Sequence, residues 1–98
     1  MKDGFRDENI DELMEAILSL ETADEAFDFF CDLCTVTELK SISQRYVVAK
    51  MLNDREVYSD IVKKTKASTA TISRVNRSLK YGNDGYAVVF DRLGKKDK

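Results

Sequence analysis

What limits the fold of this chain most is the absence of helix breakers: between Phe5 and Tyr81 there is neither a proline nor a glycine. These two residue types interrupt regular structure most strongly. A stretch of this length without them therefore favours helix throughout. The 98 residues contain no proline and four glycines, three of them after residue 81. This length fits one domain of common size. The sequence therefore predicts an all-α protein in which residues 1–98 form a single domain.

Apolar residues at helical spacing predict three helices within residues 7–55. The first has the stripe Ile10, Leu13, Met14, Ile17 and Leu18, and the third has the stripe Leu39, Ile42, Tyr46, Ala49 and Leu52. Three start signals are expected, each a capping residue followed three positions later by a carboxylate: Asn9 with Glu12, Thr22 with Glu25, and Thr35 with Glu38. The third helix is expected to end near Asn53.

The second of these helices is apolar on more than one side. Its main stripe consists of Ala26, Phe27, Phe30, Cys31 and Cys34. Phe29 and Leu33 lie off this stripe. A helix of this kind is buried by more than one neighbour. In a chain this short the extra neighbour is expected to come from a second subunit, so we interpret residues 7–55 as the dimerisation helices of an interlaced homodimer.

Two shorter helices are predicted next, at about 58–65 and 69–80, with Ser68 as the N-cap of the second. Two short helices joined by a three- or four-residue turn form the DNA-binding helix-turn-helix, here over residues 58–80. Counted from Tyr58 as the first position, the fourth, tenth, fifteenth and eighteenth positions are where the two helices press together. All four are apolar: Ile61, Ala67, Ile72 and Val75.

Two positions depart from the usual helix-turn-helix pattern, and a glycine marks where the second helix is expected to end. The fifth position is usually alanine because the helices cross closely there, and here it is Val62. The ninth is often glycine because the turn needs positive φ, and Lys66 would adopt that conformation at a cost of about 1 kcal/mol. Gly82 suits the left-handed position that ends a helix.

The segment after residue 83 has two interpretations. An Asp-Gly pair can turn a hairpin, and the apolar run behind it could be a strand. The spacing of Tyr86, Val89, Phe90 and Leu93 instead favours a short final helix over residues 84–93. We adopt the helix because there is no convincing partner strand, which brings the predicted total to about six helices.

The exposed side of the helix at 69–80 favours DNA binding over an ordinary surface helix. A surface helix normally uses Glu, Lys and Ala, whereas positions 68, 69, 71 and 73 are all Ser or Thr. Small hydroxyl and methyl side chains suit a helix that enters the major groove. Residues 57–81 also carry six basic side chains against one acidic, which adds affinity for phosphates. The predicted DNA-contacting residues are Ser68, Thr69, Ala70, Thr71, Ser73, Arg77, Lys63, Lys64, Lys66 and Lys80.

The net charge of −2 conceals two parts of opposite sign. Residues 1–38 carry two basic and twelve acidic side chains, which gives −10, whereas residues 39–98 carry fourteen and six, which gives +8. The two parts could attract each other within the fold or a dimer, or the basic part could be a working face with the acidic residues kept elsewhere. Both interpretations can hold together.

Other functional classes find little support. The chain has no histidine, so a zinc site within one chain would need more than Cys31 and Cys34, whose C-x-x-C spacing we interpret as two small apolar residues on one helix face. We predict no catalytic residue, no metal site and no cofactor, and therefore no enzyme. No apolar run approaches the roughly 20 residues of a membrane span, and the acidic N-terminus is unlike a signal peptide, so a cytoplasmic location without membrane contact is expected.

The segment "ASTATISRVNRSLKYG" resembles the recognition helix of the Trp repressor superfamily, which has an A-T-I-[ST]-R core followed by S-L-K. The tail "SLKYGNDGY" is similar to the Trp-repressor-like branch known as YerC/YecD. The similarity is strong over residues 58–86 and continues back to about Thr35. It implies an all-α, intertwined homodimer that reads a palindromic operator in double-stranded DNA, with half-sites about 34 Å apart. The implied function is that of a sequence-specific transcriptional regulator, a repressor.

The resemblance also implies an effector site. In the Trp repressor two arginines flank the effector amino acid, and alignment places them at Arg45 and Arg74, with Thr35 and Ser78 on two further ligand-contacting positions. A guanidinium grips a carboxylate with two hydrogen bonds, which suits an amino-acid-like ligand. Val75 stands where the family has a glycine that leaves room for the indole, so tryptophan itself is disfavoured. Salt bridges with the acidic N-terminal helices, or phosphate contacts, are the alternative roles of both arginines.

Two alternative functions stay open at this point. The chain could be a helical protein-interaction module whose basic face binds an acidic protein and whose apolar face binds a partner helix, without sequence-specific DNA binding. Alternatively, it could be a DNA-binding regulator that needs no effector.

Overall fold

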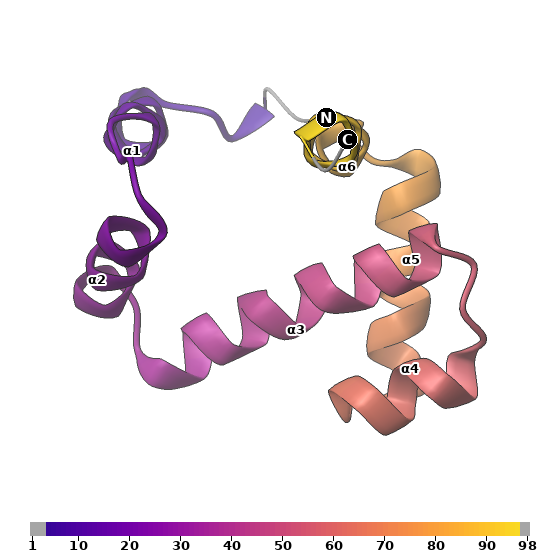
Figure 1. The fold of residues 1–98 in the computed structure, drawn as a ribbon. Helices are drawn as coiled ribbons and strands as arrows, with labels where there is room; N and C mark the ends of the chain where they lie inside the picture. The colour runs from indigo at the N-terminus through magenta and orange to yellow at the C-terminus, as the bar shows by residue number, and fades with distance from the viewer. Residues whose placement is uncertain (1–3, 97–98) are drawn as a thin grey trace. The chain divides into compact units, whose positions relative to one another are not determined.

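The computed structural model describes residues 4–96, which contain six α-helices and no β-strand (Figure 1). In chain order the helices are α1 (Glu8–Leu18), α2 (Ala23–Leu33), α3 (Val36–Asn53), α4 (Tyr58–Thr65), α5 (Thr69–Tyr81) and α6 (Gly85–Lys96). The predicted all-α class is confirmed for this part of the chain. The chain folds as two compact units, Met1–Leu39 and Lys40–Lys98, and α3 crosses the boundary between them. Over the described range no helix combines the length and the apolar character that a membrane span requires.

In the N-terminal unit, neither α1 nor α2 has a buried residue. Leu18 at the end of α1 is 82% exposed, and Phe27 on α2 is 62% exposed. The N-cap of α1 is Asp7, whose Oδ1 accepts a hydrogen bond from the Ile10 N–H at 2.9 Å. Asn9 lies inside the helix, so the predicted cap at Asn9 was wrong. Asp7 is an equally strong capping type two residues upstream, and its use lets α1 begin earlier.

The two later start signals are realised differently. At α3 the capping box is complete: the Thr35 N–H donates to Glu38 Oε1 at 2.8 Å, and the Glu38 N–H donates to Thr35 Oγ1 at 3.1 Å. The bond from the Thr35 backbone N–H, and to a lesser extent the interaction of the Glu38 carboxylate with the Thr35 hydroxyl, hold the pKa of the Glu38 carboxyl below its ordinary value. At α2 the Glu25 N–H donates to Thr22 Oγ1, but the Glu25 carboxylate accepts from the Glu21 N–H instead of the N-cap residue.

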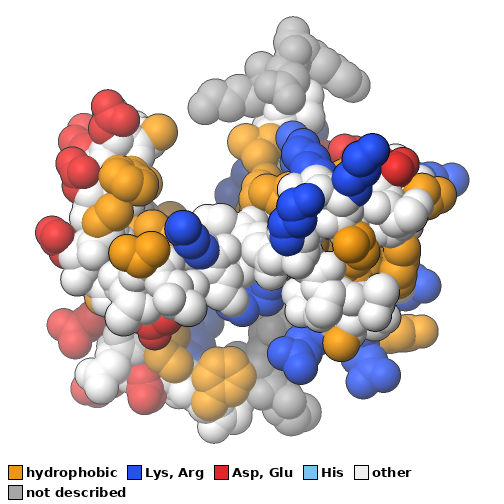
Figure 2. All heavy atoms as spheres, turned by 90° about the horizontal axis from the view of Figure 1, so that it is seen from below, with side chains coloured by type: hydrophobic (Ala, Val, Ile, Leu, Met, Phe, Trp, Pro, Cys, Tyr) orange, Lys and Arg blue, Asp and Glu red, His pale blue; other side chains and the backbone are white. Residues whose placement is uncertain are grey.

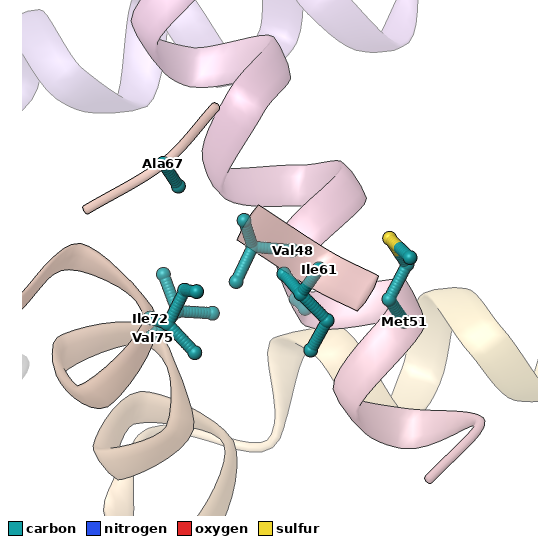
Figure 3. Close-up of a cluster of buried hydrophobic side chains, with 7 residues drawn as sticks. Val48, Met51, Ile61, Ala67, Ile72 and Val75 are labelled. Atoms are coloured by element: carbon teal, nitrogen blue, oxygen red, sulfur yellow. The ribbon is translucent and has the colours of Figure 1, made fainter. Parts of the chain in front are cut away.

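The C-terminal unit has an apolar core of its own, which Figure 3 shows at the meeting point of α3, α4, α5 and the turn before α5. Its buried residues are Val48, Ala49, Met51, Ile61, Ala67, Ile72 and Val75. Four of them, Ile61, Ala67, Ile72 and Val75, are the predicted packing positions of the helix-turn-helix, so this prediction is confirmed. The predicted bounds of the two helices also agree with α4 and α5 to within one residue.

The buried face of α3 differs from the predicted stripe. Of the five stripe residues only Ala49 is buried, and Ile42 is 41% exposed. The core instead takes Val48 and Met51, which lie beside that stripe. The last third of α3 is apolar on several sides, so the placement of α4 and α5 decides which residues are buried, and periodicity alone does not reveal it.

The backbone conformation confirms the predicted left-handed residue at Lys66 but not the one at Gly82. Lys66 has φ of 61° and ψ of 15°, which is the predicted left-handed turn residue. Gly82 is not left-handed, since it is extended with φ of −85° and ψ of −151°. A Cβ at Gly82 would lie 2.3 Å from the Ser78 carbonyl oxygen, so glycine is needed there for close approach. Asp84, directly before α6, has a positive φ of 62°. The segment that follows it is the helix α6, so the predicted final helix is confirmed and the hairpin alternative was wrong.

Candidate nucleic-acid interface

Helix α5, the second helix of the helix-turn-helix, has one buried side and one open side. Ile72 and Val75 point into the core, where Figure 3 shows them beside Val48. Thr69, Ser73 and Arg77 are all exposed and follow one another at intervals of four residues, so they form a strip along the open side. The predicted contact Ala70 is also exposed. This strip presents two hydroxyls and a guanidinium to solvent over two helical turns.

The start of α5 uses two of the predicted contacts for another purpose. Ser68 is the N-cap: its Oγ accepts a hydrogen bond from the Thr71 N–H at 3.1 Å. The Ser68 and Thr71 hydroxyl oxygens also lie 3.0 Å apart and form a hydrogen bond. Thr71 is half-buried. Both hydroxyls are therefore already engaged in capping, which leaves Thr69 and Ser73 as the hydroxyls with no such commitment.

Besides Arg77, four of the predicted contacts are exposed cations on α4, the turn and α5: Lys63, Lys64, Lys66 and Lys80. In the view of Figure 2, acidic side chains gather over α1 and α2, whereas most Lys and Arg side chains lie over the C-terminal unit. Within residues 4–96 none of these five cations forms an ion pair, so each is available to a phosphate. The first turn of α5 has no acidic residue, so its N-terminus keeps the positive end of the helix dipole open to anions.

The four residues of the implied effector site come from different parts of the chain. Thr35 belongs to the N-terminal unit, where it caps α3. In the C-terminal unit Arg45 donates to Ser41 Oγ at 3.0 Å, and Arg74 is exposed on α5. Ser78 lines an open groove of about 510 Å³ together with Tyr46, Gly82, Asn83, Gly85, Tyr86 and Val89. That lining includes neither arginine. Sequence analysis placed its two tyrosines, Tyr46 and Tyr86, on apolar helix stripes and did not predict that they line a groove.

Val75 and the two cysteines have more ordinary surroundings. The Val75 side chain is 2% exposed and belongs to the helix-turn-helix core, so its bulk packs against the protein. Cys31 is exposed at the end of α2, Cys34 is half-buried at its C-cap, and the two thiols are unpaired. In the described part of the chain no three His, Cys, Asp or Glu side chains are grouped closely enough to hold a metal ion.

Comparisons with known proteins agree with this arrangement of helices. The family model described as "Trp repressor protein" matches residues 8–94. The chain is 48% identical over 91 residues to the uncharacterized protein YerC of Bacillus subtilis (strain 168), an alignment that covers 93% of this chain and 88% of YerC.

Two solved structures superpose closely on the fold. One is a TrpR-like protein from Eubacterium eligens ATCC 27750, with a TM-score of 0.90 and 59% identity over 94% of this chain and 95% of that chain. The other is a candidate Trp repressor from Staphylococcus aureus, with a TM-score of 0.89 and 50% identity over 94% of this chain and 92% of that chain. Since the family match runs from the first residue of α1 into α6, the chain belongs to the Trp repressor family.

Proposed function

We propose that this protein is a sequence-specific DNA-binding regulator of transcription, a repressor, that acts in the cytoplasm as a homodimer on a palindromic operator. Each subunit inserts α5 into the major groove of one half-site. The exposed strip of Thr69, Ser73 and Arg77 reads base edges, while the surrounding lysines hold the phosphate backbone. Family membership supports the class of function, because the chain matches the Trp repressor family over residues 8–94.

The observation that carries the proposal is the two-sided character of α5. Ile72 and Val75 are buried in a core that the unit completes by itself, whereas Thr69 and Ser73 are exposed. Thr and Ser form helices less well than Ala, Glu or Lys, so their use on an open face needs a reason other than helix stability. A narrow, hydroxyl-bearing surface between free cations is what entry into a major groove requires.

The homodimer rests on the apolar residues of the N-terminal unit. Leu18, Phe27 and Val36 are each more than half exposed in the single chain. A patch of large apolar side chains on a folded chain marks an interaction surface. Covering this patch with a second copy gives two recognition helices related by two-fold symmetry, which is the arrangement that a palindromic operator matches.

Selection of bound fragments from a pool of random DNA tests the proposal. The expected result is a palindrome whose half-sites lie about 34 Å apart, roughly one helical turn. Such a result reports the sequence, the symmetry and the spacing in one experiment. Enrichment of no sequence, with binding that depends only on salt concentration, would contradict sequence-specific reading.

A second candidate function is a protein-interaction module, favoured by the same exposed apolar residues on α1 and α2. Substitutions on α5 separate the two candidates. Thr69→Ala and Arg77→Ala should each weaken retention on DNA at moderate salt if α5 reads DNA, whereas Lys50→Ala, on an exposed position of α3, should not. If both α5 variants are retained like the unaltered chain, the interaction module is the better interpretation.

Gating by an amino-acid-like effector is the finer part of the proposal, and it would use Arg45 and Arg74 as carboxylate partners with Ser78 and Thr35. Both arginines have exposed side chains that carry no ion pair within the described residues. Calorimetry with each free amino acid, paired with DNA affinity in its presence, tests this part. Absence of heat with every amino acid, and unchanged DNA affinity, leaves an effector-independent regulator.

A further inference from the structure

The helix-turn-helix is tied to α3 by a side chain that has no part in the DNA surface described above. Gln44, half-buried on α3, donates from Nε2 to the backbone carbonyl oxygen of Thr65 at 3.0 Å. Thr65 is the last residue of α4, and its carbonyl is one of those that a helix leaves without an internal partner. The bond joins two residues 21 positions apart, directly before the turn that leads into α5.

Thr65 also organises that turn from within. Its hydroxyl donates to the Ile61 carbonyl oxygen at 2.7 Å and accepts from the Ala67 N–H at 3.1 Å. Between these bonds, the Lys66 N–H donates to the Val62 carbonyl oxygen at 2.8 Å while Lys66 holds its left-handed conformation. Gln44 therefore binds the residue whose hydroxyl makes two of the hydrogen bonds that organise the turn.

We propose that Gln44 is a positioning residue for DNA reading: by holding the Thr65 carbonyl it fixes the turn on α3 and thereby the orientation of α5. This inference rests on the proposed function. Contacts to base edges require a donor or acceptor placed within hydrogen-bond distance, whereas long Lys and Arg side chains follow a phosphate through small rotations of the helix. Loss of the Gln44 bond therefore lowers discrimination between sequences more than it lowers affinity for DNA in general.

The core and the Gln44 bond restrain different motions of α5. Packing of Val48, Ile72 and Val75 keeps α5 against α3, but apolar contact is non-directional and tolerates sliding and rotation of a smooth helix face. A hydrogen bond is directional and fixes one point at the end of α4. Since Gln44 is only half-buried, water can reach the Thr65 carbonyl when the donor is removed, so the fold should survive the change.

The test uses the full chain with Gln44→Met, which keeps the length of the side chain and removes the donor without adding charge. Gln44→Glu is a second donorless variant of nearly the same shape, and Gln44→Lys returns a donor that can reach the carbonyl. The control is Lys50→Met, which places the same side chain on an exposed position of α3. The quantity compared is the ratio of Kd for a scrambled duplex to Kd for the selected operator at one salt concentration, because the ratio cancels the effect of a changed net charge.

We expect Gln44→Met and Gln44→Glu to lower this ratio about tenfold, the effect of losing roughly one base contact. Gln44→Lys should restore most of it, and Lys50→Met should leave it unchanged. Amide hydrogen exchange provides the second readout. In Gln44→Met the Ala67 N–H should exchange faster, while the Val48 N–H in the core keeps its protection.

The outcomes separate this inference from the proposed function. If Gln44→Met and Gln44→Glu keep the full ratio while the unaltered chain selects an operator, the positioning role is overturned and the proposed function stands. If exchange at Ala67 rises but the ratio is unchanged, the bond is structural only and the inference is again overturned. If the unaltered chain selects no sequence, both fall. Should Gln44→Met fail to fold, Gln44→Glu and Gln44→Lys still decide the question.

Discussion

The two units of this molecule differ in where their apolar residues find cover. In the C-terminal unit seven residues are buried in a core that one chain supplies by itself. In the N-terminal unit no residue of α1 or α2 is fully buried, although both helices carry large apolar side chains. The charges differ in the same way, with −10 over residues 1–38 and +8 over residues 39–98. The comparison fits the division of labour that the proposed function requires, in which a second copy completes the N-terminal unit and the C-terminal unit contacts DNA.

The largest effect is expected from a change in the self-contained core. Ile72→Ala should lower the free energy of unfolding by about 2–5 kcal/mol, because Ile72 is fully buried and its removal leaves a cavity. Denaturation in urea measures this. The matched change Leu18→Ala, at protein concentrations low enough for single chains, should cost less than about 0.5 kcal/mol, since Leu18 is exposed there. Equal losses would show that the two units do not differ as described.

The next largest effect is expected at the uncovered patch of the N-terminal unit. Leu18→Glu should weaken self-association at least hundredfold, about 2.8 kcal/mol, because each copy would bring an unpaired carboxylate into an apolar interface. Sedimentation equilibrium measures the molecular mass as a function of concentration. Leu18→Met keeps an apolar side chain and should remain associated. A mass of two chains for Leu18→Glu would place the interface elsewhere.

On the open face of α5, two residues should differ in the kind of DNA contact that they lose. Ser73→Ala should change sequence preference at about 1–3 kcal/mol per lost base contact. Lys80→Ala should weaken all sequences alike and reduce the slope of log K against log salt by about one. Binding titrations on operator and scrambled duplexes at several salt concentrations distinguish them. The same response from both residues would contradict the assigned orientation of α5.

The turn of the helix-turn-helix should gain stability from a change that weakens DNA binding. Lys66→Gly removes a side chain from a left-handed backbone, which should stabilise the fold by up to about 1 kcal/mol. It also removes one of the free cations, so affinity for any duplex should fall. Thermal unfolding and DNA titration of the same variant measure the two effects. Lys66→Arg, which keeps the charge and the Cβ, should change neither appreciably. Loss of stability in Lys66→Gly would mean that the Lys66 side chain supports the turn.

Features that depend on neighbours in sequence were predictable, and features that depend on distant contacts were not. Ile61, Ala67, Ile72 and Val75 were found because two helices joined by a short turn press together at fixed positions. The caps at Thr35 and Ser68 were found because a cap acts within three residues. At α1 both Asp7 and Asn9 are capping residue types, and no local signal indicates that the helix begins after Asp7.

The features that could not be predicted depend on how the helices pack in three dimensions. The buried side of α3 depends on where α4 and α5 lie, so Val48 and Met51 were missed. The bond from Gln44 to Thr65 spans 21 residues, and no local pattern signals it. For the candidate site, the exposure of Thr69 and Ser73 agrees with the prediction, whereas the engagement of Thr71 in capping depends on hydroxyl orientations that residue types alone do not specify.

The smallest effect is expected at the capping box of α3. There the stability of the helix start should depend on pH, whereas that of the Ile72 core should not. The pKa of Glu38 lies below its ordinary value, because its carboxylate accepts the Thr35 N–H and, to a lesser extent, interacts with the Thr35 hydroxyl. A carboxyl whose pKa is lowered by folding stabilises the fold above its unfolded pKa and loses that contribution as pH falls through the folded pKa. Acid should therefore loosen the start of α3.

Titration of the Glu38 carboxyl carbon by NMR should show this lowered pKa directly. Thr35→Val keeps the backbone N–H, which is the larger cause, so the pKa should return only part of the way to its ordinary value. Glu38→Gln keeps an acceptor for the Thr35 N–H and has no proton to gain. The protection factors of the amides at the start of α3, which are corrected for the intrinsic exchange rate, should therefore lose their dependence on acid. Those of the Ile72 core should be the same in both proteins. An ordinary pKa for Glu38, or a complete return in Thr35→Val, would mean that the reciprocal bonds of this box do not persist in solution.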